Sequence, residues 1–170
     1  MANYTEMLSI VIPVYNEEGN LALLYRELIN VLDQISNNYE IIFVDDGSSD
    51  NSLGILIDIH LIDERVKVIQ FRRNFAQTSA FSAGIDYASG ELIVTLDADG
   101  QNNPADIPLV IEEIYKHNCD FVTGWRMNRK ESPMRRLLSQ IANFIISRGT
   151  KVVVHDRGCS LKCMRADIAK

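Results

Sequence analysis

Residues 9–21, SIVIPVYNEEGNL, pass from an apolar, β-branched run into a polar turn and then into a stretch with helical periodicity. The same succession recurs along the chain, so that short apolar runs alternate with helical segments. Because connections that contain a helix imply right-handed parallel crossovers, the sequence predicts an α/β protein with a mostly parallel central sheet and helices on both faces. The predicted strands are Leu8 to Val14, Glu40 to Val44, Val66 to Gln70, Leu92 to Leu96 and Asp120 to Thr123.

Helix signals fall between these strands. Asn20 to Ile35 has apolar residues at helical spacing, Gly90 follows Gln77 to Ser89 as a stop, and Pro104 opens a segment that runs to His117. A further helix is predicted over Pro133 to Arg148. Because no repeat or flexible linker separates these elements, residues 1–170 are predicted to form a single domain.

The charge of the chain is unevenly distributed. The net charge is −6, but residues 1–125 carry 6 Lys/Arg against 20 Asp/Glu, and residues 126–170 carry 11 against 3. The net charges of the two parts are therefore −14 and +8. A basic segment after an acidic body indicates an anionic partner, either a diphosphate in a cleft or an anionic membrane surface. A solvated basic face is the alternative.

Targeting signals and cysteines bear on the location of the chain. Met1 to Met7 lacks the basic and apolar stretches of a signal peptide, and runs such as Ile10 to Val14 fall far below the ~18 residues that cross a bilayer. The chain itself is therefore expected to be soluble and to work on the cytoplasmic side of a membrane. Cys119, Cys159 and Cys163 fit neither a disulfide set nor a paired zinc pattern, which indicates buried thiols.

Polar residues follow the predicted strands at the edge where ligands bind in open parallel sheets. They are Asn16 and Glu17, Asp45 and Asp46, Arg72 to Asn74, Asp97 and Asp99, and Arg126. Loops are often polar, but polar residues after every predicted strand favour a binding site at this edge.

The pair Asp97 and Asp99 ends a buried strand. Residues i and i+2 of an extended segment point the same way, so both carboxylates can address one cation, with Gln101 as a further oxygen ligand. These oxygens suit Mg²⁺ or Mn²⁺ and leave coordination positions for a diphosphate. With 13 Asp in the chain the spacing alone is expected by chance, and solvated loop aspartates are the alternative.

Other nucleotide-binding and catalytic patterns are missing from the sequence. The first turn, Pro13 to Gly19, contains one glycine and matches neither GxGxxG nor GxxxxGK. A dinucleotide oxidoreductase and a P-loop NTPase both need such glycines for the backbone to approach phosphates, so both are disfavoured. His60 and His117 fall in helical stretches, and no Ser/His/Asp or Cys/His set has a persuasive context.

Three stretches, taken together, resemble glycosyltransferase family 2, whose fold is GT-A. They are SIVIPVYNEEGNL at 9–21, EIIFVDDGSSDNS at 40–52 and LIVTLDADGQNNP at 92–104. The resemblance implies a Rossmann-like GT-A domain over residues 1–170, with a donor and metal part at 1–125 and a basic acceptor part at 126–170. It also implies inverting, metal-dependent transfer of a hexose from a UDP- or GDP-sugar.

The resemblance also implies roles for individual residues. Asp97 and Asp99 would be catalytic together with Asp156, while Asp99 and Gln101 would hold the Mg²⁺ or Mn²⁺. Gly84 would allow close packing near the nucleotide. The implied nucleotide-binding residues are Pro13, Asn16, Glu17, Asp45, Asp46, Gly84 and Asp97.

Within the family, the C-terminal part resembles the branch that transfers sugars to polyprenyl phosphates. The stretches that carry this resemblance are residues 124–126, 135–148 and 156–162. The implied phosphate-binding residues are Arg126, Arg135, Arg136 and Arg148. The pattern QxxRW of processive synthases is absent from the sequence. Because the family pattern continues past Lys170, the chain is expected to be truncated there and to meet a membrane surface in its full-length form.

The chemistry of the acceptor leaves alternatives open. A phosphate monoester with a second pKa near ~6 is already a dianionic nucleophile at neutral pH, so it needs no general base. For a glycan, lipid or protein hydroxyl, Asp156 is the best candidate base, although a structural role for it is an equal alternative. A sugar nucleotidyltransferase and a non-catalytic nucleotide-binding remnant remain the other hypotheses. No nucleic-acid partner is expected, and a homo-oligomer is compatible with the sequence.

Overall fold

The structure is a computed structural model that describes residues 4–124 and 159–170. The strands of this part are β1 (Leu8–Val14), β2 (Tyr39–Asp45), β3 (Val66–Gln70), β4 (Leu92–Thr95), β5 (Phe121–Thr123) and β6 (Lys162–Arg165). Its helices are α1 (Leu21–Ile35), α2 (Ser52–Ile62), α3 (Gln77–Tyr87), the 3₁₀ turn η1 (Pro104–Asp106), α4 (Ile107–His117) and α6 (Ala166–Ala169).

The strands form one sheet in the order β3-β2-β1-β4-β6-β5. The strands β1 to β4 are parallel, with Leu8 opposite Tyr39 and Leu92. This confirms the predicted α/β fold with a mostly parallel sheet. The sequence did not predict β6, which pairs antiparallel with both β4 and β5 and so separates them. The predicted strand at Asp120 to Thr123 corresponds to β5, which lies at the edge of the sheet beside β6.

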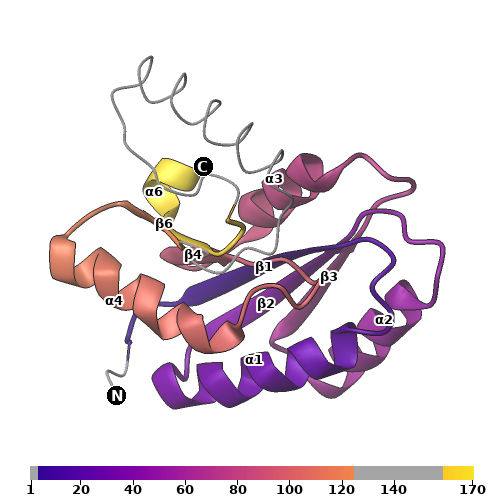
Figure 1. The fold of residues 1–170 in the computed structure, drawn as a ribbon, viewed down its shortest axis with the longest axis horizontal. Coiled ribbons are helices and arrows are strands. Elements are labelled where there is room, and N and C mark those ends of the chain that lie inside the picture. Colours follow the sequence, from indigo (N-terminus) through magenta and orange to yellow (C-terminus); the bar gives the residue numbers. More distant parts are fainter. Residues whose placement is uncertain (1–3, 125–158) are drawn as a thin grey trace, which may run out of the picture.

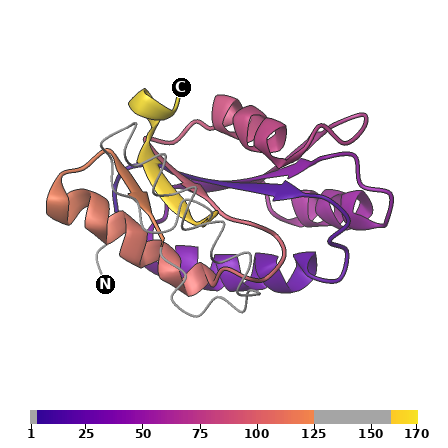
Figure 2. The same ribbon diagram turned by 45° about the horizontal axis from the view of Figure 1, so that its top comes forward.

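Helices cover both faces of the sheet, as Figures 1 and 2 show. The helices α1, α2 and α4 pack on one face around a core that includes Ile10 and Phe43. On the other face α3 and α6 pack around a smaller core that includes Val11 and Ile42. Because β1 and β2 are covered on both sides, nearly all of their residues are buried, which explains their continuous apolar sequences.

Glu40 is a buried carboxylate that ties three strands together near the amino ends of β1 and β2. It accepts hydrogen bonds from Ser9 Oγ and from the Ser89 backbone N–H, both at 2.6 Å, and it forms an ion pair with Lys67. Burial alone would raise the pKa of Glu40, but hydrogen bonds from Lys67, Ser9 and Ser89 outweigh it and lower the pKa. Glu40 therefore stays ionised and fixes the register of the sheet away from the polar edge.

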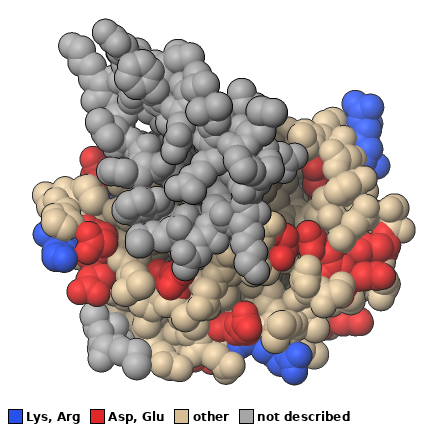
Figure 3. Space-filling view, in the orientation of Figure 1, with Lys and Arg blue, Asp and Glu red and all other residues tan. Residues whose placement is uncertain are grey.

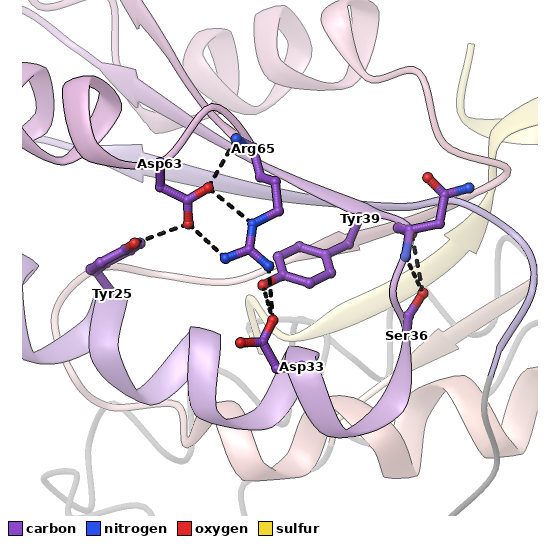
Figure 4. A network of polar contacts seen from close by, with 7 residues as sticks. Tyr25, Asp33, Ser36, Tyr39, Asp63 and Arg65 are labelled. Carbon is purple, nitrogen blue, oxygen red and sulfur yellow. Dashed lines mark hydrogen bonds and ion pairs between the residues drawn. The ribbon is translucent and has the colours of Figure 1, made fainter.

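A second polar network joins α1 to the starts of β2 and β3 (Figure 4). Arg65 donates to Asp63 through Nε and Nη2 at 2.9 Å and to Asp33 through Nη1 at 2.8 Å. Its guanidinium lies 4.6 Å from the centre of the Tyr39 ring, and the Tyr25 hydroxyl donates to Asp63 at 2.9 Å. The hydrogen bonds from Arg65 lower the pKa of Asp63. This network holds α1 against the sheet at the end opposite the predicted site.

Candidate functional site

A pocket of about 200 Å³ lies beyond the carboxyl ends of β1, β2 and β4. This is the edge at which open parallel sheets bind their ligands. The start of α3 closes one side of it. The described residues that line the pocket are Pro13, Val14, Tyr15, Glu17, Asp46, Asn74, Ala76, Gln77, Asp97, Ala98 and Asp99.

The pocket is acidic. Its described lining contains the carboxylates Glu17, Asp46, Asp97 and Asp99 and no Lys, Arg or His. Figure 3 shows further Asp and Glu side chains gathered on the side of the molecule where the loops after β1 and β2 lie. A phosphorylated ligand would be repelled by these carboxylates unless a cation or basic side chains from elsewhere offset their charge.

The loops that follow β1 and β2 are joined by hydrogen bonds. The Asn16 backbone N–H donates to Ser48 Oγ at 3.0 Å, and Asn16 Oδ1 accepts the Ser49 backbone N–H at 2.8 Å. The Glu17 backbone N–H donates to Ser52 Oγ at 2.9 Å. Asn16 has a positive φ of 56°, a conformation that asparagine tolerates better than most residues. These contacts hold Glu17 at the rim of the pocket.

Asp46 organises the loop that follows β3. It is buried, with 2% of its surface exposed, and its Oδ1 accepts the Phe75 backbone N–H at 2.7 Å. The neighbouring Gly47 has a φ of +71°, and a Cβ there would lie 2.5 Å from the carbonyl carbon of Arg73. Only glycine lets the two loops approach this closely. Asp46 therefore both faces the pocket and fixes the backbone that brings Asn74 to it.

Ala76 is the strained residue of the pocket. Its backbone angles are φ 72° and ψ 155°, a region that is occupied almost only by glycine. Ala76 precedes α3, and its carbonyl accepts the first hydrogen bonds of that helix, from Ser79 and Ala80. The strain therefore lies where the chain turns from the β3 loop into the helix that carries Gln77.

Replacing Ala76 by glycine is expected to stabilise the protein by about 1 kcal/mol. Relief of strain, about 1–3 kcal/mol, exceeds the extra entropy that glycine gains in the unfolded chain, about 0.5–1 kcal/mol. Thermal unfolding should show a rise of about 2–4 °C. Ala83→Gly, inside the same helix, is the matched control and should lower the midpoint by a similar amount. A fall in both variants would contradict the strain at Ala76.

The loop after β4 carries the paired aspartates. Asp97 Oδ1 accepts a hydrogen bond from Gln77 Nε2 at 2.6 Å, which links this loop to α3. Asp99 Oδ1 accepts the Gln101 backbone N–H at 3.0 Å, and Gly100 between them has a φ of +73°. The tight turn exposes Asp99 and Gln101 at its tip.

The carboxylate oxygens of Asp97 and Asp99 suit a hard divalent cation. In the described part of the chain no group of three or more His, Cys, Asp or Glu side chains forms a complete metal cage. Mg²⁺ and Mn²⁺ do not require such a cage, because they are often held by one or two carboxylates and by the phosphates of a substrate. Asp97 and Asp99 line the pocket and can supply those carboxylates. The side chain of Gln101 lies on the same turn, outside the described lining.

The structure brings together only some of the residues that the sequence singled out. Pro13, Glu17, Asp46, Asp97 and Asp99 line the pocket. Three other predicted nucleotide-binding residues are described but do not line the pocket: Asn16, Asp45 and Gly84. Asn16 joins the two loops, Asp45 Oδ1 accepts the Ser48 N–H at 3.3 Å, and Gly84 packs against the sheet. Their role in nucleotide binding stays a prediction. Asp156, Arg126, Arg135, Arg136 and Arg148 lie outside the described residues.

Gly84 serves the packing of α3 on the sheet. A Cβ at this position would lie 2.3 Å from Cγ1 of Val11 and 3.2 Å from Cγ2 of Val44. Glycine therefore allows α3 to approach β1 and β2 closely. The predicted role of Gly84 near a nucleotide would therefore be indirect, through the position of the helix that begins at Gln77.

The sequence did not identify Ala76 and Gln77 as pocket residues, whereas Tyr15 lies in the loop Pro13 to Glu17 that the family resemblance implied for the nucleotide. Gln77 was recognised only as the start of a helix. The hydrogen bond between Gln77 and Asp97 joins residues 20 positions apart, so no local pattern predicts it. The backbone strain at Ala76 has no recognisable sequence signal.

Two solved structures have a similar fold. The glucosyl-3-phosphoglycerate synthase of Mycobacterium tuberculosis in complex with uridine-diphosphate has a TM-score of 0.73 at 17% identity, over 96% of this chain and 58% of that one. A second structure of that enzyme, with Mn²⁺, uridine-diphosphate-glucose and phosphoglyceric acid, has a TM-score of 0.73 at 16% identity, with the same coverage. The fold of this chain is therefore GT-A-like.

The chain belongs to glycosyl transferase family 2, whose family model matches residues 9–170. The dodecaprenyl-phosphate galacturonate synthase of Rhizobium johnstonii is 40% identical over 168 residues, which cover 96% of this chain and 49% of the relative. The undecaprenyl-phosphate 4-deoxy-4-formamido-L-arabinose transferase of Proteus mirabilis is 42% identical over 161 residues, which cover 94% and 49%. The chain thus spans about half the length of these relatives.

Proposed function

We propose that this chain is the donor-binding part of an inverting, metal-dependent glycosyltransferase that moves a sugar from a nucleotide-diphosphate sugar to a polyprenyl phosphate. The observation that carries the proposal is the pocket in which Asp97 and Asp99, from the loop after β4, meet Glu17 and Asp46, which directly follows β2. Carboxylates alone would repel a diphosphate, whereas carboxylates with a divalent cation bind it.

Each part of the pocket has a role in the proposal. Pro13, Glu17 and Asp46 would contact the nucleoside, because they lie on the side of the pocket formed by β1 and β2. Asp97 and Asp99, with Gln101, would hold Mg²⁺ or Mn²⁺. The cation would neutralise the charge that develops on the leaving diphosphate. Gln77 would keep Asp97 oriented through its hydrogen bond at 2.6 Å.

The proposed acceptor follows from charge and from the relatives. Both relatives described above are named for a polyprenyl phosphate. A phosphate dianion needs positive charge to approach an anionic donor and needs no general base. The segment 126–170, with a net charge of +8, can supply that charge through Arg126, Arg135, Arg136 and Arg148. In this proposal the protein works on the cytoplasmic side of a membrane. In the described part of the chain no helix has the length and apolar character to span a bilayer.

A donor screen tests the first half of the proposal. Thermal unfolding of the chain would be followed with UDP-, GDP- and other nucleotide sugars, with and without Mn²⁺, because a ligand that binds the native state raises its stability. Stabilisation that requires both nucleotide and Mn²⁺ supports the proposal, and stabilisation unchanged by EDTA opposes it. The screen also identifies the sugar. The family resemblance implies a hexose, and the two relatives are named for galacturonate and for a formamido-arabinose.

Charge reversal of Arg135 and Arg136 to glutamate is expected to weaken vesicle binding and sugar transfer together, each by at least about ten-fold, because each cation near an anionic membrane contributes about 1 kcal/mol. Nucleotide affinity should stay unchanged. The assay uses the full-length protein on anionic vesicles that contain polyprenyl phosphate. The matched control reverses Arg26 and Lys116, two exposed cations of the acidic part.

Transfer to water-soluble hydroxyl acceptors would oppose the polyprenyl-phosphate assignment if it proceeded equally well without lipid and ignored the reversals at Arg135 and Arg136. The glycosyltransferase proposal would then continue with a hydroxyl acceptor and with Asp156 as its candidate base.

A further inference from the structure

The loop between β4 and η1 is held at two buried points. Ala98 is 4% exposed and Asn102 is 6% exposed, whereas Asp99, Gly100 and Gln101 between them are exposed. Ala98 packs in the apolar core and needs no polar partner. Asn102 is polar, so its burial requires hydrogen bonds.

The partners of Asn102 lie far along the chain. Asn102 Nδ2 donates to Ser160 Oγ at 2.6 Å, and Cys159 Sγ donates to Asn102 Oδ1 at 3.8 Å. Ser160 is itself fixed, because its carbonyl accepts a hydrogen bond from Thr95 Oγ1 at 2.6 Å. These side-chain contacts are buried. They lock the end of the loop to the segment that leads into β6.

Asn102 is adjacent in sequence to Gln101, one of the predicted metal ligands. Gln101 directly precedes Asn102, and the Gln101 backbone N–H donates to Asp99 Oδ1 at 3.0 Å. A change in the position of Asn102 therefore shifts Gln101 and loosens the turn that orients Asp99. Ala98 fixes only the other end of this exposed tip.

We propose that Asn102 and Ser160 are positioning residues whose buried hydrogen bond holds Asp99 and Gln101 where both can contact a divalent cation bound with a nucleotide diphosphate. The inference rests on the proposed function and deepens it. Loss of a group that orients a metal ligand typically lowers metal affinity by about 10- to 100-fold. Because Ser160 lies within the basic segment 126–170, the bond also links the metal-binding turn to the proposed acceptor part of the chain.

The test removes the bond from either side, with Asn102→Ala and Ser160→Ala. Calorimetry would measure the affinity of each variant for UDP, with GDP in parallel, in Mn²⁺ and in EDTA. The gain in affinity that Mn²⁺ gives should shrink about 10- to 100-fold in both variants, while the affinity in EDTA changes little. The double variant should lose no more than Asn102→Ala alone, because the bond to Ser160 is already absent from that variant. Ser160→Thr keeps the hydroxyl and should keep most of the gain.

Asn103→Ala is the matched control. Asn103 is the next residue, is exposed, and accepts the Ala105 backbone N–H at 3.0 Å as the cap of η1. Its loss should lower the unfolding temperature and leave the Mn²⁺ gain intact. The inference is overturned if Asn102→Ala and Ser160→Ala fold and keep the full gain, or if Asn103→Ala loses as much.

If Asn102→Ala does not fold, the gain in nucleotide affinity that Mn²⁺ gives to Ser160→Ala tests the inference alone. If Mn²⁺ does not raise the nucleotide affinity of the wild-type chain, both the proposed function and this inference are overturned. If Mn²⁺ raises the affinity of the wild type and of both variants equally, only this inference is overturned.

Discussion

Replacing Asp99 by alanine is expected to lower the affinity for UDP or GDP in Mn²⁺ by about 100-fold or more, to the level seen in EDTA. Asp99 is the exposed carboxylate of the turn and lines the pocket with three other acidic residues. Without a cation, the diphosphate meets only negative charge in the described lining. Calorimetry in Mn²⁺ and in EDTA measures the two affinities.

The nucleotide affinity of Asp99→Ala in EDTA shows whether the variant loses a metal ligand or is misfolded. Because Asp99→Ala removes one negative charge, its affinity in EDTA should equal or slightly exceed that of the wild type. Asp99→Asn is the sharper variant, since an amide oxygen can still accept the Gln101 backbone N–H and preserve the turn. It should lose nearly as much affinity in Mn²⁺ as the alanine variant. Asp86→Ala, an exposed acid near the end of α3, should lose none.

A wild-type affinity that is the same in EDTA and Mn²⁺ would contradict the metal-site proposal. So would an Asp99→Asn variant with full affinity in Mn²⁺, because the charge of Asp99 would then have no role.

Most of the fold could be predicted because its strong signals are local. The strand Val66–Gln70 was predicted with its observed bounds, and Leu8–Val14 likewise. Leu8–Val14 is a mostly apolar run, as a parallel strand covered on both faces requires, and Val66–Gln70 is a short run with three β-branched residues at the edge of the sheet. The segment predicted from Pro104 to His117 begins as a 3₁₀ turn and becomes α-helical at Ile107, a difference that depends on local capping by Asn103.

The strand β6 could not be predicted in the same way. Its sequence, Lys-Cys-Met-Arg, has charged residues at both ends and no β-branched residue. It is a strand because β4 and β5 leave a space between them and because Cys163 and Met164 bury their side chains there. Burial raises the pKa of Cys163 to about 12, so this thiol stays neutral and apolar in character. Such pairing is a tertiary effect.

The part of the site that could be predicted is the part where alternate residues after a strand point the same way. Asp97 and Asp99 follow β4 and both reach the pocket. The pair after β2 divides instead, because adjacent residues at the end of a strand point to opposite sides. Asp46 lines the pocket, whereas Asp45 accepts the Ser48 N–H within its own turn. The role of Asn102 needs Ser160, 58 residues away, and no local pattern reveals it.

Replacing Asp46 by alanine is expected to weaken binding of free UDP or GDP by about 10- to 100-fold, and to weaken the whole nucleotide sugar equally. Asp46 sits at the end of β2, on the side of the pocket away from the paired aspartates' loop, so it should contact the nucleoside and not the sugar. The variant also leaves the Phe75 backbone N–H without the partly buried, charged acceptor it has at 2.7 Å. That loss should lower the free energy of unfolding by about 1–3 kcal/mol.

The variant Asp46→Asn separates these two contributions. Its amide oxygen can still accept the Phe75 N–H, so the stability should recover, but the charge that strengthens a hydrogen bond to the nucleoside is gone. Calorimetry should therefore show most of the affinity loss without the stability loss. If Asp46→Asn binds nucleotide like the wild type while Asp46→Ala does not, Asp46 acts only by holding the loop that carries Asn74. If either variant loses discrimination between sugars but keeps its affinity for free nucleotide, the sugar and not the nucleoside lies beside Asp46, and the proposed orientation of the donor in the pocket must be reversed.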